Sequence, residues 1–344
     1  MKLERVGEFG LIKRIEKRVE GQADGVLLGI GDDAAAFQPG KGMTSLITTD
    51  IFVEGIHFDL AYSTPYQIGW KAMAANLSDI AAMGGLPRVA VVSLCLPERI
   101  EVEWVEELYD GMKDIIQRFE GTIIGGDTSA AQSETIINIA LIGEVEEKRM
   151  VTRSGAKVGD LICVTGELGS SVAGLRFLRE QKTTGKKSQT KWSPLIDRHL
   201  VPVPRIHEAR TLLKKARVNA MIDISDGLAS EIHHICAMSG TGAKIYLEEI
   251  PIHPQTRLSA LESGRDAHQD ALYGGEDFEL LFTLSSKNLT DTLEMLRNET
   301  GTMASTIGAI VEAGQGITLI DENSSRISLP FRGYDHFSKM MIRR

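Results

Sequence analysis

Apolar side chains recur along this chain with two different spacings, and both spacings occur in each half. Residues 7–19 repeat their large apolar side chains every three or four positions, which is the period of an amphipathic helix. Residues 135–145 alternate apolar and polar side chains, as a half-buried strand does. Because strand-like and helix-like segments alternate in this way, we expect mixed layers of α and β structure in each half.

The first half carries the clearest element boundaries. A long helix is expected from Pro65, which suits the first turn of a helix, to the Gly84-Gly85 pair, which ends it. A second helix at residues 101–119 has acidic residues in its first turn, where they complement the helix dipole. Strands are expected at residues 26–30, 45–49, 88–96 and 122–124.

The second half begins after a polar, basic and glycine-containing segment at residues 146–159. A chain of 344 residues is too long for one ordinary core, so we predict two domains, residues 1–148 and residues 149–344. The polar run at residues 182–191 is expected to be a solvated loop. Further strands are expected at residues 161–165, 220–224 and 278–284, and helices at residues 204–216 and 228–238.

Composition narrows the class of protein. An apolar content of 42% and a charged content of 25% are those of a globular protein in water. The net charge of −9 argues against a nucleic-acid partner, which needs a basic face. No apolar run reaches the roughly 18 residues of a membrane helix, and the N-terminus has no apolar signal core. The three cysteines are far apart, so neither a zinc site nor a disulfide framework is indicated. We expect a cytoplasmic enzyme.

Six short strings place an acidic residue beside glycine or a hydroxyl residue, mostly where an apolar run stops. Carboxylates gathered at strand ends repel one another unless a cation lies between them, and Mg²⁺ takes oxygen ligands of this kind and bridges to phosphates. Each string alone is also compatible with an ordinary turn, because Gly and Asp are common turn residues. The strings are residues 31–33, 48–50, 76–79, 125–129, 223–227 and 274–277.

Two of these strings are more specific than the others. Thr48, Thr49 and Asp50 offer hydroxyl and carboxylate oxygens at close spacing, which suits octahedral Mg²⁺, although a plain β-branched strand end is an alternative. Asp79 is expected near the C-terminal end of a helix, where the dipole disfavours a carboxylate. A cation would compensate for that placement, and simple exposure to water is the alternative.

The remaining candidate residues also have two interpretations. Asp223 and Asp226 flank Ser225 at a strand-to-helix corner, where they suit either a helix cap or a metal ion. The glycines before Glu276 would allow a ligand to approach the backbone, or would simply form a tight turn. His57 lies between two apolar residues and is compatible with a partly buried structural histidine. Arg153 belongs to a basic segment that is either solvated or phosphate-binding.

The two common phosphate-binding loops are absent. No G-x-x-x-x-G-K-[ST] string occurs, and no G-x-G-x-x-G string opens a helix after a strand. If a polyphosphate binds, metal ions and glycine N–H groups must therefore carry most of its charge.

Nine strings, in order along nearly the whole chain, resemble the thiamine-monophosphate kinase family. Several are shared with a wider superfamily that includes aminoimidazole ribonucleotide synthetase, whereas the first, the third with His57 and the last point to the kinases. The strings are GEF at 7–9, GIGDD at 29–33, TTD at 48–50, NLSDIAAMG at 76–84, GGDT at 125–128, TRSGAK at 152–157, IDISDGL at 222–228, GGEDFEL at 274–280 and GYDHF at 333–337.

The resemblance implies a fold and an activity. The fold would be of the aminoimidazole ribonucleotide synthetase-like type, with an N-terminal α+β domain of sheet and helices that pairs with a second copy in a homodimer, and a C-terminal α/β domain. The activity would be ATP-dependent phosphorylation of thiamine monophosphate to thiamine diphosphate, assisted by several Mg²⁺ ions. Since the acceptor is already an anionic phosphate oxygen, we expect direct in-line transfer without a strong general base.

The resemblance also assigns roles to residues. Asp50 and Asp127 would be the most critical residues, and Asp32 and Asp277 are expected to be structural neighbours rather than ligands. Metal ligands would be Asp33, Thr48, Thr49, Asp50, Asp79, Asp127, Asp223 and Asp226. ATP contacts would be Tyr109, Gly126, Asp127, Arg153 and Ser225, and substrate contacts His57, Glu276 and Phe331.

The chain departs from the family pattern at Phe331, where a tryptophan is common. A phenylalanine can still stack on a thiamine ring, but it lacks the indole N–H and some contact area. Two other classes remain open: another ATP-dependent synthetase of the same superfamily, and a non-catalytic nucleotide-binding partner protein.

Overall fold

The computed structural model describes residues 3–19, 25–28, 36–185, 190–215 and 217–334. The chain divides into two compact units, which are treated separately below. Unit 1 comprises Met1–Ile80, Gly85–Met150 and Leu200–Ile206, and unit 2 comprises Ala81–Gly84, Val151–His199 and His207–Arg344. The domains expected from the sequence, residues 1–148 and 149–344, remain a prediction.

Unit 1 is built on a four-stranded sheet in the order β3-β6-β4-β5. The pairs β3–β6 and β4–β6 are antiparallel, and the pair β4–β5 is parallel. The strands are β3 (Met43–Val53), β4 (Leu86–Pro97), β5 (Thr122–Ala131) and β6 (Ile136–Glu146), with a separate small pair formed by β1 (Val26–Leu28) and β2 (Ala36–Phe37). The helices are α1 (Leu3–Val19), α2 (Pro65–Ala82) and α3 (Val102–Gln117).

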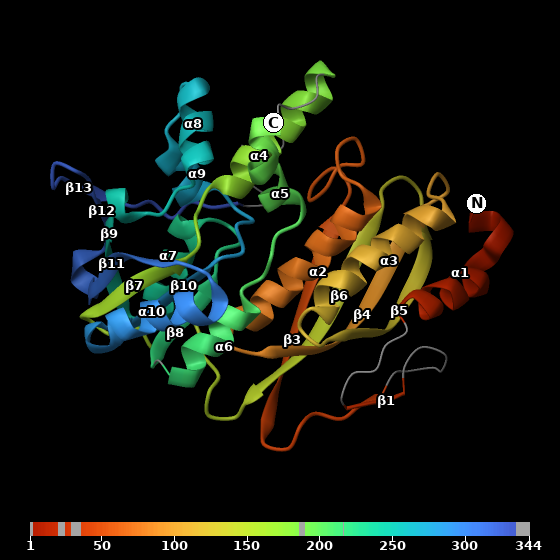
Figure 1. Cartoon of the computed structure of the whole chain (residues 1–344), viewed down its shortest axis with the longest axis horizontal. Coiled ribbons are helices and arrows are strands. Elements are labelled where there is room, and N and C mark those ends of the chain that lie inside the picture. Colours follow the sequence, from red (N-terminus) through yellow and green to blue (C-terminus); the bar gives the residue numbers. More distant parts are fainter. Residues whose placement is uncertain (1–2, 20–24, 29–35, 186–189, 216, 335–344) are drawn as a thin grey trace. The chain divides into compact units, whose positions relative to one another are not determined.

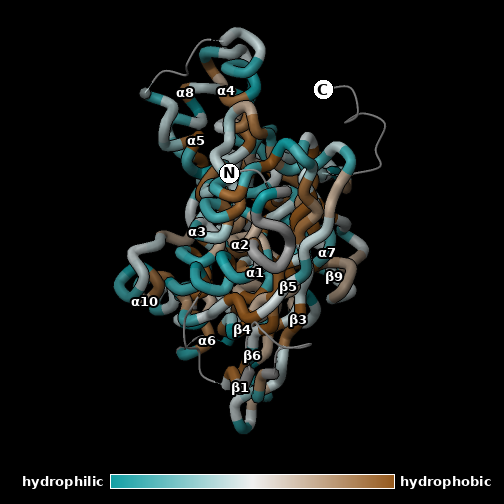
Figure 2. Tube along the Cα trace, turned by 90° about the vertical axis from the view of Figure 1, so that its right-hand side faces the viewer, coloured by the Kyte–Doolittle hydropathy of each residue, from teal (hydrophilic) through white to brown (hydrophobic). Residues whose placement is uncertain are grey.

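The two faces of this sheet differ sharply in burial. Side chains on one face of each strand are buried, as Leu94 of β4 and Ile139 of β6 illustrate, while their sequence neighbours such as Ser93 are exposed. Figure 2 shows hydrophobic stretches, in brown, in the region of β4 and β6. Figure 1 shows α2 and α3 lying across the sheet. We call the buried side the covered face and the other side the open face.

Helices α2 and α3 touch at two glycines. A Cβ atom on Gly69 would lie 2.0 Å from the carbonyl oxygen of Leu108, and one on Gly111 would lie 2.0 Å from the carbonyl oxygen of Tyr66. Real Cβ atoms do not approach a carbonyl so closely, so the crossing requires glycine at both positions. This contact sets how closely α3 packs beside α2, the helix that carries Asp79.

Unit 2 is built on a seven-stranded sheet in the order β13-β12-β9-β11-β7-β10-β8. Its pairs are antiparallel except for β9 and β12, which are parallel. The strands are β7 (Asp160–Thr165), β8 (Val218–Asp223), β9 (Thr241–Tyr246), β10 (Leu280–Ser285), β11 (Ala304–Glu312), β12 (Ile317–Ile320) and β13 (Arg326–Ser328).

Helices of unit 2 share a continuous apolar core with this sheet. Ile222 of β8, Ile232 of α7, Ala271 of α9 and Leu281 of β10 all belong to it. The helices are α4 (Ser170–Thr184), α5 (Ser193–Leu200), α6 (Ile206–Lys215), α7 (Leu228–Ser239), α8 (Pro254–Glu262), α9 (Ala267–Tyr273) and α10 (Leu289–Thr300). Short 3-10 helices occupy Thr190–Trp192, Leu247–Glu249, Ser286–Asn288 and Ala313–Gln315.

Most predicted elements are confirmed. The helix expected from Pro65 is α2, and the helices expected at 101–119, 204–216 and 228–238 are α3, α6 and α7. The expected fold class is also confirmed, since mixed sheets with helices form both units.

Three boundaries predicted from the sequence are wrong. Strand β3 does not end at Thr49 but continues to Val53, and β5 runs through Gly125, Gly126 and Asp127 to Ala131. In both cases ladder bonds to neighbouring strands continue past the polar residues. The loop expected at 182–191 begins later, because residues 182–184 complete α4, and residues 186–189 lie outside the described part of the chain.

Across the described ranges, no helix combines the length and the apolar character needed to cross a membrane.

The contact between α2 and α3 gives a stability prediction. Gly111→Ala should lower the free energy of unfolding by about 1–3 kcal/mol or more, because the added methyl must push α2 and α3 apart. Gly314→Ala is the control, since a Cβ there meets no atom within 4 Å. Urea unfolding followed by circular dichroism measures both, and equal stability of the two variants would contradict the close crossing.

Candidate functional site

In unit 1, two predicted metal ligands from distant parts of the sequence touch each other. Thr48 follows the buried Leu46 by two positions along β3. Side chains two positions apart in a strand share a face, so Thr48 points to the covered face. Its Oγ1 donates a hydrogen bond to the Oδ2 atom of Asp79 on α2. Asp50 follows Thr48 by two positions and lies on the same face. Three candidate oxygen-bearing side chains thus share one side of the sheet.

Thr49 lies on the other side. The side-chain amide of Asn138 on β6 donates to Thr49 Oγ1 at 3.0 Å and to the main-chain oxygen of Asp50 at 3.1 Å. Asn138 is a residue that the sequence reasoning missed. The available signal was a lone amide inside the isoleucine-rich strand β6.

Asp127 lies at the other edge of the open face. The register pairs Asp127 with Ser93, and Ser93 with Asn138, so these residues form one row across the sheet. Asp127 is exposed, and its Oδ1 accepts the backbone N–H of Thr128 at 2.9 Å. The preceding Gly126 has a structural reason to be glycine, because a Cβ there would lie 2.1 Å from the carbonyl oxygen of Val92.

The two other unit 1 candidates differ in accessibility. Tyr109, the predicted ATP contact on α3, is only 2% exposed, and burial raises the pKa of its hydroxyl. His57 is partly buried, and its Nδ1 accepts the backbone N–H of Val53 at 3.0 Å. In a neutral imidazole that arrangement leaves the proton on Nε2. Asp33 lies outside the described residues.

In unit 2, two strings that the sequence analysis treated separately are joined by backbone hydrogen bonds. The Glu276 N–H donates to Ser225 at 2.7 Å, the Phe278 N–H donates to Ile224 at 2.9 Å, and the Ile224 N–H donates to Glu279 at 2.7 Å. A Cβ on Gly275 would lie 2.5 Å from the Ser225 carbonyl oxygen, so this approach needs glycine there. The predicted substrate residue Glu276 therefore lies against the predicted metal-holding turn.

The loop after Gly275 has an unusual backbone. Glu276 has φ +66° and Phe278 has φ +51°, both in the left-handed region that disfavours residues with a Cβ. Each such residue costs on the order of 1 kcal/mol and persists only where the surroundings enforce it. Here the backbone bonds to residues 224–225 do so.

A buried carboxylate that the sequence reasoning missed stands beside this turn. Glu231, in the first turn of α7, is 2% exposed, and its Oε1 accepts the Asp226 N–H at 2.9 Å. Its Oε2 is buried without a hydrogen-bond partner. Burial and, to a smaller extent, the charges of Asp226 and Asp223 together raise the pKa of Glu231 to about 8. The carboxyl groups of Asp223, Asp226 and Glu231 are therefore close enough to act on one another electrostatically.

The C-terminal segment of the described chain packs on α7. The Tyr334 N–H donates to the Asp226 carbonyl oxygen at 3.2 Å. Phe331 is 64% exposed, and its ring meets His233 and His234 edge-on, with centroids 5.5 and 5.6 Å apart. Burial and then the nearby charge of Arg153 lower the pKa of His234. Phe331 and Arg153, predicted for substrate and ATP, therefore both lie near His234.

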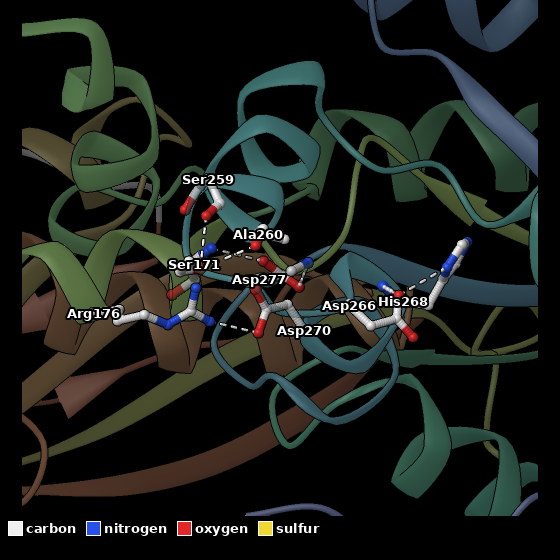
Figure 3. Close-up of polar contacts among 10 residues, drawn as sticks. Ser171, Arg176, Ser259, Ala260, Asp266, His268, Asp270 and Asp277 are labelled. Carbon is white, nitrogen blue, oxygen red and sulfur yellow. Dashed lines mark hydrogen bonds and ion pairs between the residues drawn. The ribbon is translucent and has the colours of Figure 1, made fainter.

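Asp277 has a structural partner of its own. Its carboxylate accepts the N–H groups of Gly169 at 2.7 Å and Ser171 at 3.1 Å, at the N-terminus of α4. Figure 3 shows Asp277 beside Ser171, with Arg176 of α4 paired to Asp270 nearby. These contacts give Asp277 a structural role at the start of α4, and its exclusion from the ligands stays a prediction.

The chemistry of these groups suits Mg²⁺. The candidate ligands offer only hydroxyl, carboxylate and carbonyl oxygens, which hard divalent ions prefer. The partnerless oxygen of Glu231 beside Asp223 and Asp226 also marks a turn where a cation would relieve repulsion. No group of three or more His, Cys, Asp or Glu side chains is gathered for a metal ion within the ranges that the structure covers. The metal-ligand assignments therefore stay predictions.

Family models match both parts of the chain. The N-terminal domain of AIR synthase related proteins matches residues 31–145, and the C-terminal domain of the same proteins matches residues 157–321.

Named relatives agree over nearly the full length. Thiamine-monophosphate kinase from Bacillus subtilis is 36% identical over 335 residues, covering 96% of this chain and 99% of the relative. The crystal structure of thiamine-monophosphate kinase from Stenotrophomonas maltophilia matches with a TM-score of 0.81 and 33% identity, covering 91% of this chain and 96% of that one. The structure of AaThiL complexed with AMPPCP and TMP matches with a TM-score of 0.76 and 34% identity, covering 98% of this chain and 99% of that one.

The Asp277 carboxylate predicts how stability depends on pH. Burial raises the pKa of Asp277 to about 7, above the value of roughly 4 in an unfolded chain. The folded state therefore holds this proton more tightly, so the free energy of unfolding should fall as pH rises from about 4 to about 7.

In the Asp277→Asn variant, the decrease in the free energy of unfolding between about pH 4 and pH 7 should be smaller by about 1–3 kcal/mol. The reason is that asparagine carries no titrating proton. Urea unfolding at a series of pH values, without metal or nucleotide, measures it. Asp291→Asn removes an exposed carboxylate on α10 and serves as the control. If the free energy of unfolding changes with pH to the same extent in the wild type and in the Asp277→Asn variant, the prediction is refuted.

Proposed function

The chain belongs to the thiamine-monophosphate kinase family of AIR synthase related proteins, and on that premise we propose that it transfers the γ-phosphoryl group of ATP to thiamine monophosphate. The products are thiamine diphosphate and ADP. One structural observation supports this most: backbone bonds hold Glu276 against the turn that carries Ser225 and Asp226. A residue suited to a cationic organic substrate thus lies beside residues suited to a metal-bound phosphate.

We propose that several Mg²⁺ ions bind to the oxygen-bearing residues. When bound, they would neutralise phosphate charge so that two anions can approach. In unit 1 the ligands would be Asp33, Thr48, Thr49, Asp50, Asp79 and Asp127, and in unit 2 Asp223 and Asp226. ATP contacts would be Tyr109, Gly126 and Asp127 in unit 1, and Arg153 and Ser225 in unit 2.

The organic substrate would be recognised by three side chains. The Glu276 carboxylate would attract the cationic thiazolium or bond to the aminopyrimidine. The exposed ring of Phe331 offers a surface for stacking on a thiamine ring. The Nε2–H of His57 offers a donor, because its Nδ1 is held by Val53. None of them needs to act as a general base, since the acceptor oxygen is already anionic.

The open face of the unit 1 sheet supports a homodimer. Ile47 is 75% exposed, Ile51 53% and Val91 38%, on strands that lie in one sheet. Exposed β-branched side chains on one face of a sheet form a surface that a second copy would cover. We also propose a cytoplasmic location.

One assay tests the reaction and its competitors. The purified chain is incubated with Mg²⁺, thiamine monophosphate and ATP carrying an isotopic label in the γ-phosphate. Labelled thiamine diphosphate with ADP is expected, with no label trapped on the protein. Labelled phosphoprotein formed at a competent rate would rule out direct transfer. No turnover at all would favour the synthetase or the non-catalytic alternative.

Two substitutions test the metal assignments. Asp50→Ala and Asp127→Ala should each lower kcat at least about 100-fold, because loss of a metal ligand removes charge neutralisation at the phosphates. Circular dichroism should show an unchanged fold, and Asp291→Ala serves as the surface control. A folded Asp50→Ala enzyme with a near-normal rate would remove Asp50 from the ligand set.

A further pair of substitutions tests the dimer. Ile47→Lys and Ile51→Lys place charges on the open face, where burial of an unpaired charge disfavours association. Light scattering after gel filtration should show a dimer for the wild type and a monomer for the double variant. Lys substitution at the exposed Met238 of α7, in unit 2, provides the control. A wild-type monomer, or a dimer that survives both substitutions, would contradict this interface.

A further inference from the structure

The carboxylate of Glu276 is met by a buried histidine. His199, the residue before the last of α5, is 3% exposed, and its Nδ1 lies 3.5 Å from Glu276 Oε2. Both residues belong to unit 2. The sequence analysis did not single out His199, because nothing in its local sequence indicates a partner so far along the chain.

The imidazole is itself held in place. Ser171 Oγ lies 3.0 Å from the same Nδ1 atom, and Ser171 is fully buried. The Ser171 N–H in turn donates to the Asp277 carboxylate at 3.1 Å. Glu276, His199, Ser171 and Asp277 therefore form a closed ring of contacts, because Asp277 directly follows Glu276. We call these four residues the Glu276 ring.

The neighbouring residue repeats the pattern. Arg198 lies 3.5 Å from the buried carboxylate of Glu279, which also accepts the Thr165 hydroxyl at 2.7 Å. Two consecutive residues near the C-terminus of α5 thus face two acidic residues of one loop. Basic side chains are favoured at that end of a helix by its dipole. The last turn of α5 is suited to holding the 276–279 loop.

The backbone of the loop makes this support necessary. Glu276 occupies the left-handed region at φ +66° and is tied to Ser225 through its N–H. These restraints fix the Cα of Glu276 but do not by themselves set its side-chain torsions. A glutamate that rotates freely loses conformational entropy on meeting a ligand, whereas one already oriented does not. The His199 contact provides that orientation.

We propose that His199 is a positioning residue which, together with Ser171, fixes the Glu276 carboxylate for the cationic organic part of the substrate. It would set the affinity for thiamine monophosphate and leave that for ATP unchanged. This rests on the proposed function. A histidine that only fills the core would instead affect stability, with no difference between the two substrates.

The test compares two substitutions of His199. His199→Leu removes the ring nitrogen and should raise the KM for thiamine monophosphate about 10-fold, which corresponds to about 1.4 kcal/mol. The KM for ATP and the kcat should stay within about 2-fold. His199→Asn keeps an N–H group near the position of Nδ1, and should restore the KM to within about 3-fold of the wild type.

Controls separate positioning from folding. His268→Leu removes another largely buried histidine, which lies near Asp266 and Glu248, and should leave both KM values unchanged. Glu276→Ala should raise the KM for thiamine monophosphate, and adding His199→Leu to it should cause no further rise if His199 acts through Glu276. If His199→Leu does not fold, Ser171→Ala replaces it, with a smaller rise expected in the same KM.

The possible outcomes separate a failure of the proposed function from a failure of the positioning role. A wild-type enzyme that does not convert thiamine monophosphate defeats the proposed function itself. An active wild type whose His199→Leu variant keeps its KM for thiamine monophosphate overturns the positioning role. Equal rises in both KM values, or additive effects in the double variant, overturn it as well. A rise confined to thiamine monophosphate and reversed by asparagine supports it.

Discussion

The backbone hydrogen bonds between residues 224–225 and residues 276–279 are the constraint on which the unit 2 site depends. They hold Glu276 and Phe278 in a left-handed backbone that these residues would not adopt alone. They also bring a loop that suits an organic cation against a turn that suits a metal-bound phosphate. Gly275 permits the approach, since any Cβ there would collide with the Ser225 carbonyl oxygen.

Around that constraint, polar side chains with little or partial exposure fix the directions of others. Glu231 accepts the Asp226 N–H, Asp277 accepts two N–H groups of α4, and His199 meets Glu276. Unsatisfied buried polar groups are costly, so each pairing restricts the loop further. In unit 1, the strands of a sheet fix the directions of the polar side chains. Its covered face presents Thr48 to Asp79, whereas its open face carries Thr49, Asn138 and exposed isoleucines.

Local sequence predicted the elements better than their ends. Gly125 and Gly126 lower strand propensity, and Asp127 is a turn residue, so a strand end was the natural prediction there. Pairing with β4 overrides that preference and carries β5 to Ala131. Similarly, β3 continues past Asp50 because β6 pairs with every residue from Met43 to Val53. Strand ends depend on partners that local propensity does not contain.

The sequence by itself determined the types of chemical group, their order along the chain and the helices and strands that carry them. Its ordered strings also identified the family, which the matches to AIR synthase related domains bear out. Only the tertiary structure decided that Thr48 meets Asp79, that Thr49 meets Asn138, and that His199 meets Glu276. The reason is physical: composition and spacing are local, but the strand register and the packing of α5 arise from contacts between residues far apart in sequence.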